Sequence, residues 1–70
     1  MISEAQVREL FHLYDQFHGA LNPLAPEILE AERAFFAKLE SLHTTHAPDV
    51  PFHEFRRYAV RKCKEYLRKN

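Results

Sequence analysis

The sequence predicts an all-α protein, a three-helix bundle in which successive helices run up, down and up. Hydrophobic residues make up 46% of the 70 positions, and they recur at steps of three and four residues, as on one face of a helix. Glycine, which disfavours helix interiors, occurs only once. Two proline-containing stretches divide the chain into three amphipathic segments. Connections this short favour antiparallel neighbours.

The first expected helix covers residues 3–18 and has signals at both ends. Ser3 and Gln6 have the spacing of a capping box, in which each residue satisfies a free backbone N–H of the other. Gly19 stands where a left-handed C-terminal cap is expected. The stripe predicted to face the core contains Val7, Leu10, Tyr14, Phe17 and Leu21, widened by Phe11 and Leu13.

The second expected helix covers residues 26–45. Pro26 suits the first helical position, because its fixed φ fits a helix and its missing N–H would be unpaired there anyway. At 1.5 Å per residue this helix is roughly 30 Å long. Its predicted inward stripe contains Ile28, Ala31, Phe35, Leu39 and Leu42, with Leu29 and Phe36 on the flank.

The third expected helix covers residues 51–68, with Asp49 as its candidate N-cap. Its apolar face contains Phe52, Phe55, Ala59, Cys63, Tyr66 and Leu67, with Val60 at the edge. The competing fold is a helix-turn-helix domain whose third helix enters the major groove of DNA. The simple bundle is favoured, because the second helix is long for that motif and the turn around Asp49 is rich in proline.

Length and composition predict one small domain, residues 1–70, in the cytoplasm. A chain this short buries only about 60% of the surface that its unfolded form exposes. Small domains therefore often need disulfides, a metal or oligomerisation to be stable. Cys63 is the only cysteine, which excludes an internal disulfide and favours a reducing compartment. The sequence begins without an apolar signal segment. No apolar run approaches the roughly 20 residues of a membrane-spanning helix.

Three histidines, His43, His46 and His53, cluster around the second connection. Together with Asp49 they form the chain's candidate metal site, because zinc binds imidazole and carboxylate ligands. The spacing H-x2-H-x6-H is not a zinc signature that we recognise, and no cysteine lies nearby. We therefore expect His43 and His46 to cover the end of the apolar stripe, and we expect no metal and no other cofactor.

Charge is divided unevenly along the chain. Residues 1–50 carry eight acidic and three basic side chains, whereas residues 51–70 carry seven basic and two acidic ones. Four of the basic residues align on the outer face of the third helix: Arg57, Arg61, Lys64 and Arg68. Such a stripe can follow a phosphate backbone. Zero net charge gives little long-range attraction to nucleic acid, so a solvated face or an acidic protein partner is favoured.

Two charged residues interrupt the apolar arcs, Glu32 on the second helix and Arg56 on the third. A buried charge without a partner is costly. If the second and third helices pack with nearly parallel axes, Glu32 and Tyr66 lie at the same distance from the connection between them. We therefore expect Glu32 to accept a hydrogen bond from Tyr66 or Tyr14. We expect Arg56 to reach an acid near the start of the first helix, such as Glu4.

The sequence gives little support for catalysis. It has no glycine-rich phosphate loop, no metalloprotease helix motif and no evident nucleophile with its base, and Cys63 is expected to pack in the core. We expect a small non-enzymatic helical protein-interaction module, an adaptor or regulatory subunit. The alternative is a nucleic-acid-binding accessory protein that uses the third helix.

The apolar arcs of the first two helices are broader than a surface helix needs. We expect their flanks to stay partly uncovered and to bind another protein or a second copy, as a homodimer. The candidate partner-binding residues are Leu13, Leu29 and Phe36.

Overall fold

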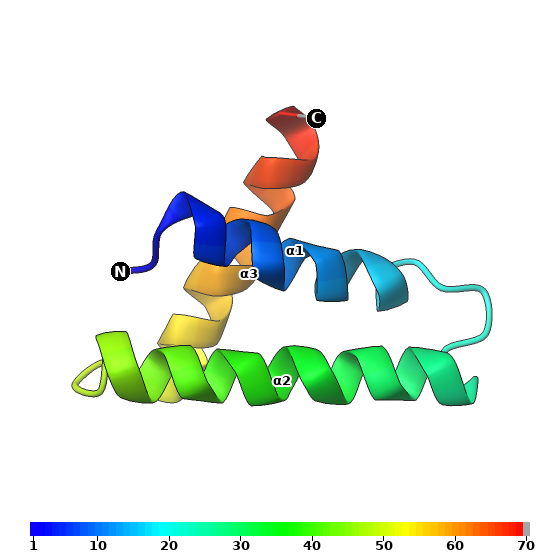
Figure 1. The fold of residues 1–70 in the computed structure, drawn as a ribbon, viewed down its shortest axis with the longest axis horizontal. Helices are drawn as coiled ribbons and strands as arrows, with labels where there is room; N and C mark the ends of the chain where they lie inside the picture. Colours follow the sequence, from blue (N-terminus) through cyan, green and yellow to red (C-terminus); the bar gives the residue numbers. More distant parts are fainter. Residues whose placement is uncertain (70) are drawn as a thin grey trace.

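The computed structural model describes residues 1–69, which form three α-helices. They are α1 (Glu4–Phe17), α2 (Pro26–His46) and α3 (Phe52–Lys69), shown in Figure 1. The all-α, three-helix class is confirmed, and each helix ends within one residue of the expected boundary. None of the three helices is both long enough and apolar enough to cross a membrane.

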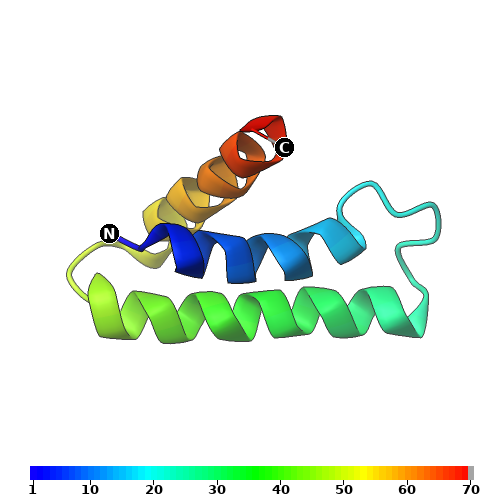
Figure 2. The ribbon, with the colours of Figure 1, turned by 45° about the horizontal axis from the view of Figure 1, so that its top comes forward.

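The first two helices form an antiparallel hairpin, and α3 crosses this hairpin at a steep angle (Figures 1 and 2). The start of α3 lies beside the end of α2, whereas its C-terminal half leaves α2 and passes beyond α1. Ala59 and Cys63, two small side chains of α3, are completely buried. Small residues let helix axes approach closely at a crossing, which brings α3 onto the hairpin there.

The predicted helix ends are confirmed for α1. The Ser3 hydroxyl accepts a hydrogen bond from the Gln6 N–H at 3.2 Å, and the Gln6 side-chain oxygen accepts one from the Ser3 N–H at 2.8 Å. Gly19 follows the end of the helix with a φ of 73°, a left-handed conformation that costs glycine little.

Asp49 is not the N-cap of α3. The first turn instead starts at the Pro51 carbonyl, which accepts hydrogen bonds from the N–H groups of Glu54 and Phe55 at 3.0 and 3.1 Å. The cap position therefore falls two residues later than expected, on a residue that offers no side-chain acceptor.

The core lies where α3 crosses the hairpin, and it consists of inward-facing residues predicted from periodicity together with one residue of the second connection. Its buried members are Leu10, Tyr14, Phe35, Leu39, Leu42, Ala47, Phe55, Ala59 and Cys63. Two expected core residues are exposed, Leu21 and Leu67. The first lies beyond the end of α1, and the second lies in the part of α3 that has passed the hairpin.

Aromatic rings join α1 to α2 within the hairpin. The ring centroid of Phe35 lies 5.4 Å from that of Phe17 and 6.0 Å from that of Tyr14. Phe36 meets Phe35 edge to face at 5.6 Å. Such aromatic pairs stabilise beyond the area they bury, so they help to hold α1 and α2 together.

Two leucine substitutions test where the core lies. Leu39 is fully buried, whereas Leu21 is fully exposed in the first connection. We expect Leu39→Ala to lower the free energy of unfolding by about 2–5 kcal/mol through lost burial and a cavity. We expect Leu21→Ala to change it by less than about 0.5 kcal/mol. Urea denaturation followed by circular dichroism measures both, and equal losses would contradict the assigned core.

Candidate functional site

On one side of α2, a line of residues becomes more exposed toward the N-terminus of the helix. Leu29, Phe36 and His43 are seven residues apart and therefore lie on the same side of the helix. The His43 ring contacts Phe52 and Phe55 of α3, at centroid distances of 5.4 and 5.3 Å. Phe36 is only partly buried, and Leu29 is 42% exposed. This line becomes uncovered as α3 moves away from α2 (Figure 2).

Two carboxylates flank Phe36 on this side of α2. Glu32 lies one turn before it and Glu40 one turn after it, and both are exposed. We call Glu32, Phe36 and Glu40 the acidic triplet. The sequence predicts a hydrogen bond from Tyr66 or Tyr14 to Glu32, whereas the structure packs the Tyr66 ring against Phe11 of α1 and leaves Glu32 exposed. The C-terminal half of α3 leaves α2 (Figures 1 and 2), so the parallel packing of these two helices on which this prediction rested is not found.

A second triplet has the opposite charge and lies on α3. Arg56 and Lys64 are one turn before and one turn after Val60, which is partly buried against the core. We call Arg56, Val60 and Lys64 the basic triplet. Together with Arg57 and Arg61 these residues line a shallow hollow of about 340 Å³.

The expected ion pair between Arg56 and Glu4 is also absent. Arg56 is exposed and forms no ion pair with any residue that the structure describes. It lies roughly on the opposite side of α3 from Tyr58, whose hydroxyl faces the start of α1. Arg56 therefore lies on the side of α3 that is turned away from the start of α1.

The four residues of the predicted basic stripe remain together on the exposed side of α3. Arg57, Arg61, Lys64 and Arg68 are all exposed, and within residues 1–69 none forms an ion pair. The Arg61 guanidinium carbon lies 5.7 Å from the centre of the Tyr58 ring, which is within range of a cation–π contact.

The three candidate partner-binding residues do not form one patch. Leu29 and Phe36 share the line described above, whereas Leu13 lies one turn after Glu9, whose carboxylate pairs with Lys38 at 2.8 Å. Leu13 is partly buried there. It lies roughly on the opposite side of α1 from Phe11, which contacts Tyr66 of α3, so it belongs to the side of the hairpin away from α3.

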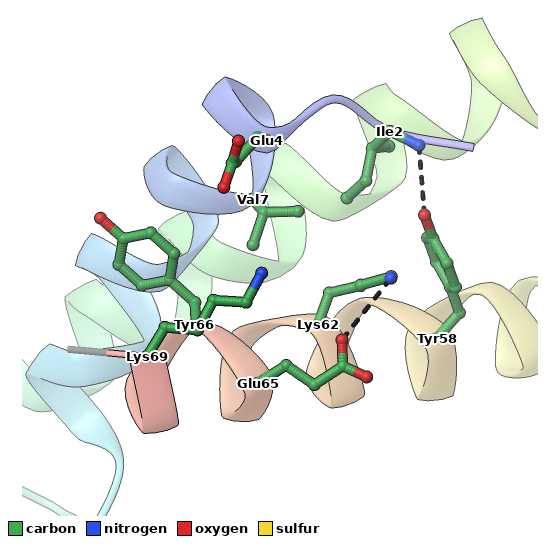
Figure 3. Close-up of a pocket in the computed structure, with 8 residues that line it drawn as sticks. All are labelled: Ile2, Glu4, Val7, Tyr58, Lys62, Glu65, Tyr66 and Lys69. Atoms are coloured by element: carbon green, nitrogen blue, oxygen red, sulfur yellow. Dashed lines mark hydrogen bonds and ion pairs between the residues drawn. The ribbon is translucent and has the colours of Figure 1, made fainter.

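A second hollow, of about 290 Å³, lies between the start of α1 and α3 (Figure 3). The Tyr58 hydroxyl accepts hydrogen bonds from the Met1 amino group at 3.2 Å and the Ile2 N–H at 3.3 Å. Lys62 and Glu65 form an ion pair at 3.5 Å. Sequence reasoning missed this hollow, because its lining comes from opposite ends of the chain: Ile2, Glu4, Val7, Tyr58, Lys62, Glu65, Tyr66 and Lys69.

The three histidines of the second connection have separate surroundings. His43 contacts the Val50 carbonyl through its Nε2 atom, and its ring covers the end of the core as expected. The Nε2 atom of His46 lies 3.0 Å from the Gln6 amide nitrogen, whereas His53 is exposed. Among residues 1–69, no three histidine, cysteine or carboxylate side chains are grouped closely enough to hold a metal ion.

Cys63 is completely buried, and burial raises the pKa of its thiol to about 11. A thiol with such a pKa is almost entirely protonated at neutral pH, and the thiolate is the reactive form. Tyr14 is also buried, and this burial raises the pKa of its phenol. These two groups therefore serve packing in the folded chain.

No protein-family model, no curated protein and no solved structure matches this chain. The arrangement of its residues is thus the basis for its functional interpretation.

The buried thiol predicts how stability depends on pH. The pKa of Cys63 is about 11 in the folded protein against 9.0 as its ordinary value, so the folded state retains the proton longer. Its contribution to stability is complete below pH 9 and is lost as the pH rises toward 11. We expect this group to remove on the order of 2–3 kcal/mol across that range.

Urea denaturation between pH 8 and pH 11 measures this loss, and Cys63→Ala provides the control. The variant lacks the thiol but keeps Tyr14, whose raised pKa destabilises both proteins as the pH rises above 10. We therefore expect a shallower decline in the variant, whatever its stability at pH 8. Identical slopes would show that Cys63 is not protected from ionisation.

Proposed function

We propose that this chain is a small non-enzymatic protein-interaction module of the cytoplasm. Its binding surface, which we call the open face, consists of the acidic and basic triplets together with Leu29 and Leu67. The observation that carries this proposal is the divergence of α3 from α2, which leaves Leu29 uncovered and Phe36 half covered. Apolar groups framed by charge are typical of surfaces that bind another protein.

The size of the protein supports this proposal. Its core gathers at the crossing of α3 with the hairpin, and on α2 it leaves Leu29 exposed and Phe36 only partly buried. A partner that covered Phe36 and Leu29 would bury additional apolar surface and stabilise the fold through binding.

The side chains with the greatest catalytic potential support a non-enzymatic role. Cys63 is enclosed in the core, and the rings of His43 and His46 contact different partners. Activation of a nucleophilic thiol requires a base within hydrogen-bonding reach of it. The positions of these side chains therefore support a binding role over a catalytic one.

Site-specific photo-cross-linking tests the binding surface. A benzoylphenylalanine at position 36 places the reactive group on the open face, and the same residue at Ser41 lies about 140° further around α2. In the cells that naturally contain the protein, we expect a discrete cross-linked species from position 36 and none from position 41. Equal labelling from the two positions, or no protein adduct at position 36, would contradict the proposal.

Nucleic-acid binding is the second candidate, and one observation favours it. The exposed cations of the basic stripe form no ion pair with the chain's own acids within residues 1–69. Arg57, Arg61, Lys64 and Arg68 are therefore available to phosphate groups, and such contacts weaken steeply with salt.

Oligonucleotide titrations test this second function. If it is correct, labelled duplex or single-stranded oligonucleotides bind at low salt, and alanine at Arg57, Arg61, Lys64 and Arg68 abolishes binding. Alanine at Arg8, Arg33, Lys62 and Lys69 removes the same number of charges elsewhere and should leave most of the affinity. Fluorescence anisotropy at two salt concentrations gives the answer. No binding at low salt, or equal losses in both variants, would exclude the stripe as a phosphate-binding site.

A further inference from the structure

The acidic and basic triplets have the same spacing and opposite charges. On α2, Glu32 and Glu40 lie one turn to either side of Phe36, and on α3, Arg56 and Lys64 lie one turn to either side of Val60. Each apolar centre is partly buried and each flanking charge is exposed. The two triplets are thus matched in length, apolar centre and charge.

Within one chain the two triplets do not pair. The ion pairs among residues 1–69 are Lys38 with Glu9 and Lys62 with Glu65, and neither includes a member of a triplet. The reason is the inclination of α3, which carries its C-terminal half away from α2 (Figures 1 and 2). Four complementary charges therefore face solvent beside incompletely covered apolar side chains.

We infer that a second copy of this chain covers the open face, with the basic triplet of each copy on the acidic triplet of the other. This inference rests on the proposed interaction function and names the partner. A two-fold axis presents the same surface from both subunits, so each pairing occurs twice. Leu29 is seven residues from Phe36 and Leu67 is seven residues from Val60, so each exposed leucine lies on the same side of its helix as one triplet and is covered with it.

Charge complementarity favours a second copy over a different partner. The open face carries both signs in a fixed arrangement, so a uniformly acidic or uniformly basic partner would meet repulsion on one triplet. A rotated copy presents the opposite sign to each triplet. Because the net charge of the chain is zero, two copies approach without overall repulsion, and the local pairs set their orientation.

Sedimentation equilibrium across micromolar concentrations provides the first measurement. We expect the wild-type chain to approach the dimer mass as concentration rises. Two charge-reversed variants then break opposite halves of the interface: Glu32→Lys with Glu40→Lys, and Arg56→Glu with Lys64→Glu. Each places like charges against one another in its own homodimer, and we expect its dissociation constant to rise by at least about tenfold.

Mixing the two charge-reversed variants provides the decisive measurement. In the mixed dimer the reversed α2 meets the reversed α3, while the natural α3 of the first variant meets the natural α2 of the second. Both pairings are again between opposite charges. We therefore expect an equimolar mixture to dimerise at concentrations at which each variant alone is mostly monomeric, a result that a general loss of folding cannot produce.

Two control variants carry the same change in net charge away from the open face. They are Glu27→Lys with Glu30→Lys, and Lys62→Glu with Lys69→Glu, and we expect both to dimerise like the wild type. Circular dichroism checks that every variant remains helical. A reversed variant that loses its helical signal is replaced by the milder glutamine substitutions at the same two positions, for which weaker dimerisation is expected.

Three results would overturn the inference: a wild-type monomer at every concentration, charge-reversed variants that dimerise normally, or a mixture that stays monomeric. A monomer that still gives cross-linked adducts of other masses from position 36 would contradict the dimer and leave the interaction module standing. Loss of the adducts as well would contradict both.

Discussion

The steep crossing of α3 over the hairpin is the constraint on which the rest of the structure depends. Ala59 and Cys63 are small enough to let α3 pass closely at this point, and the core gathers around them. Two inclined helices can touch only over a short length. The same geometry therefore leaves the N-terminal part of α2 without contact to α3, and the C-terminal end of α3 without contact to α2. The open face is therefore a direct result of how the core is packed.

Local features were predictable from sequence because their causes are local. The capping box of Ser3 and Gln6 and the left-handed Gly19 depend on neighbouring residues, and each was found where expected. The helix boundaries agree to within one residue, although the cap of α3 is Pro51 and not Asp49. The buried stripes also followed from helical periodicity, since a residue's side of a helix is fixed by its position. The prediction that Leu21 faces the core was wrong because α1 ends at Phe17.

The partners of Glu32 and Arg56 could not be predicted in the same way. Their expected contacts assumed helices packed along nearly parallel axes, which places Glu32 level with Tyr66. The inclination of α3 depends on contacts between distant segments, and periodicity carries no information about it. Periodicity predicts which side of α2 exposes Phe36. It does not predict where Arg56, Val60 and Lys64 of α3 lie relative to that side.

The attachment of α3 also has a consequence for the order of folding. Although α2 precedes it in the chain, α3 meets α2 mainly near their connection, through His43. Its other anchors are on α1: Tyr66 against Phe11 at 4.9 Å, and the Tyr58 hydroxyl beside the N–H of Ile2. Such contacts close long loops and form late. The hairpin can therefore assemble first, and α3 can detach from it as a unit during local unfolding.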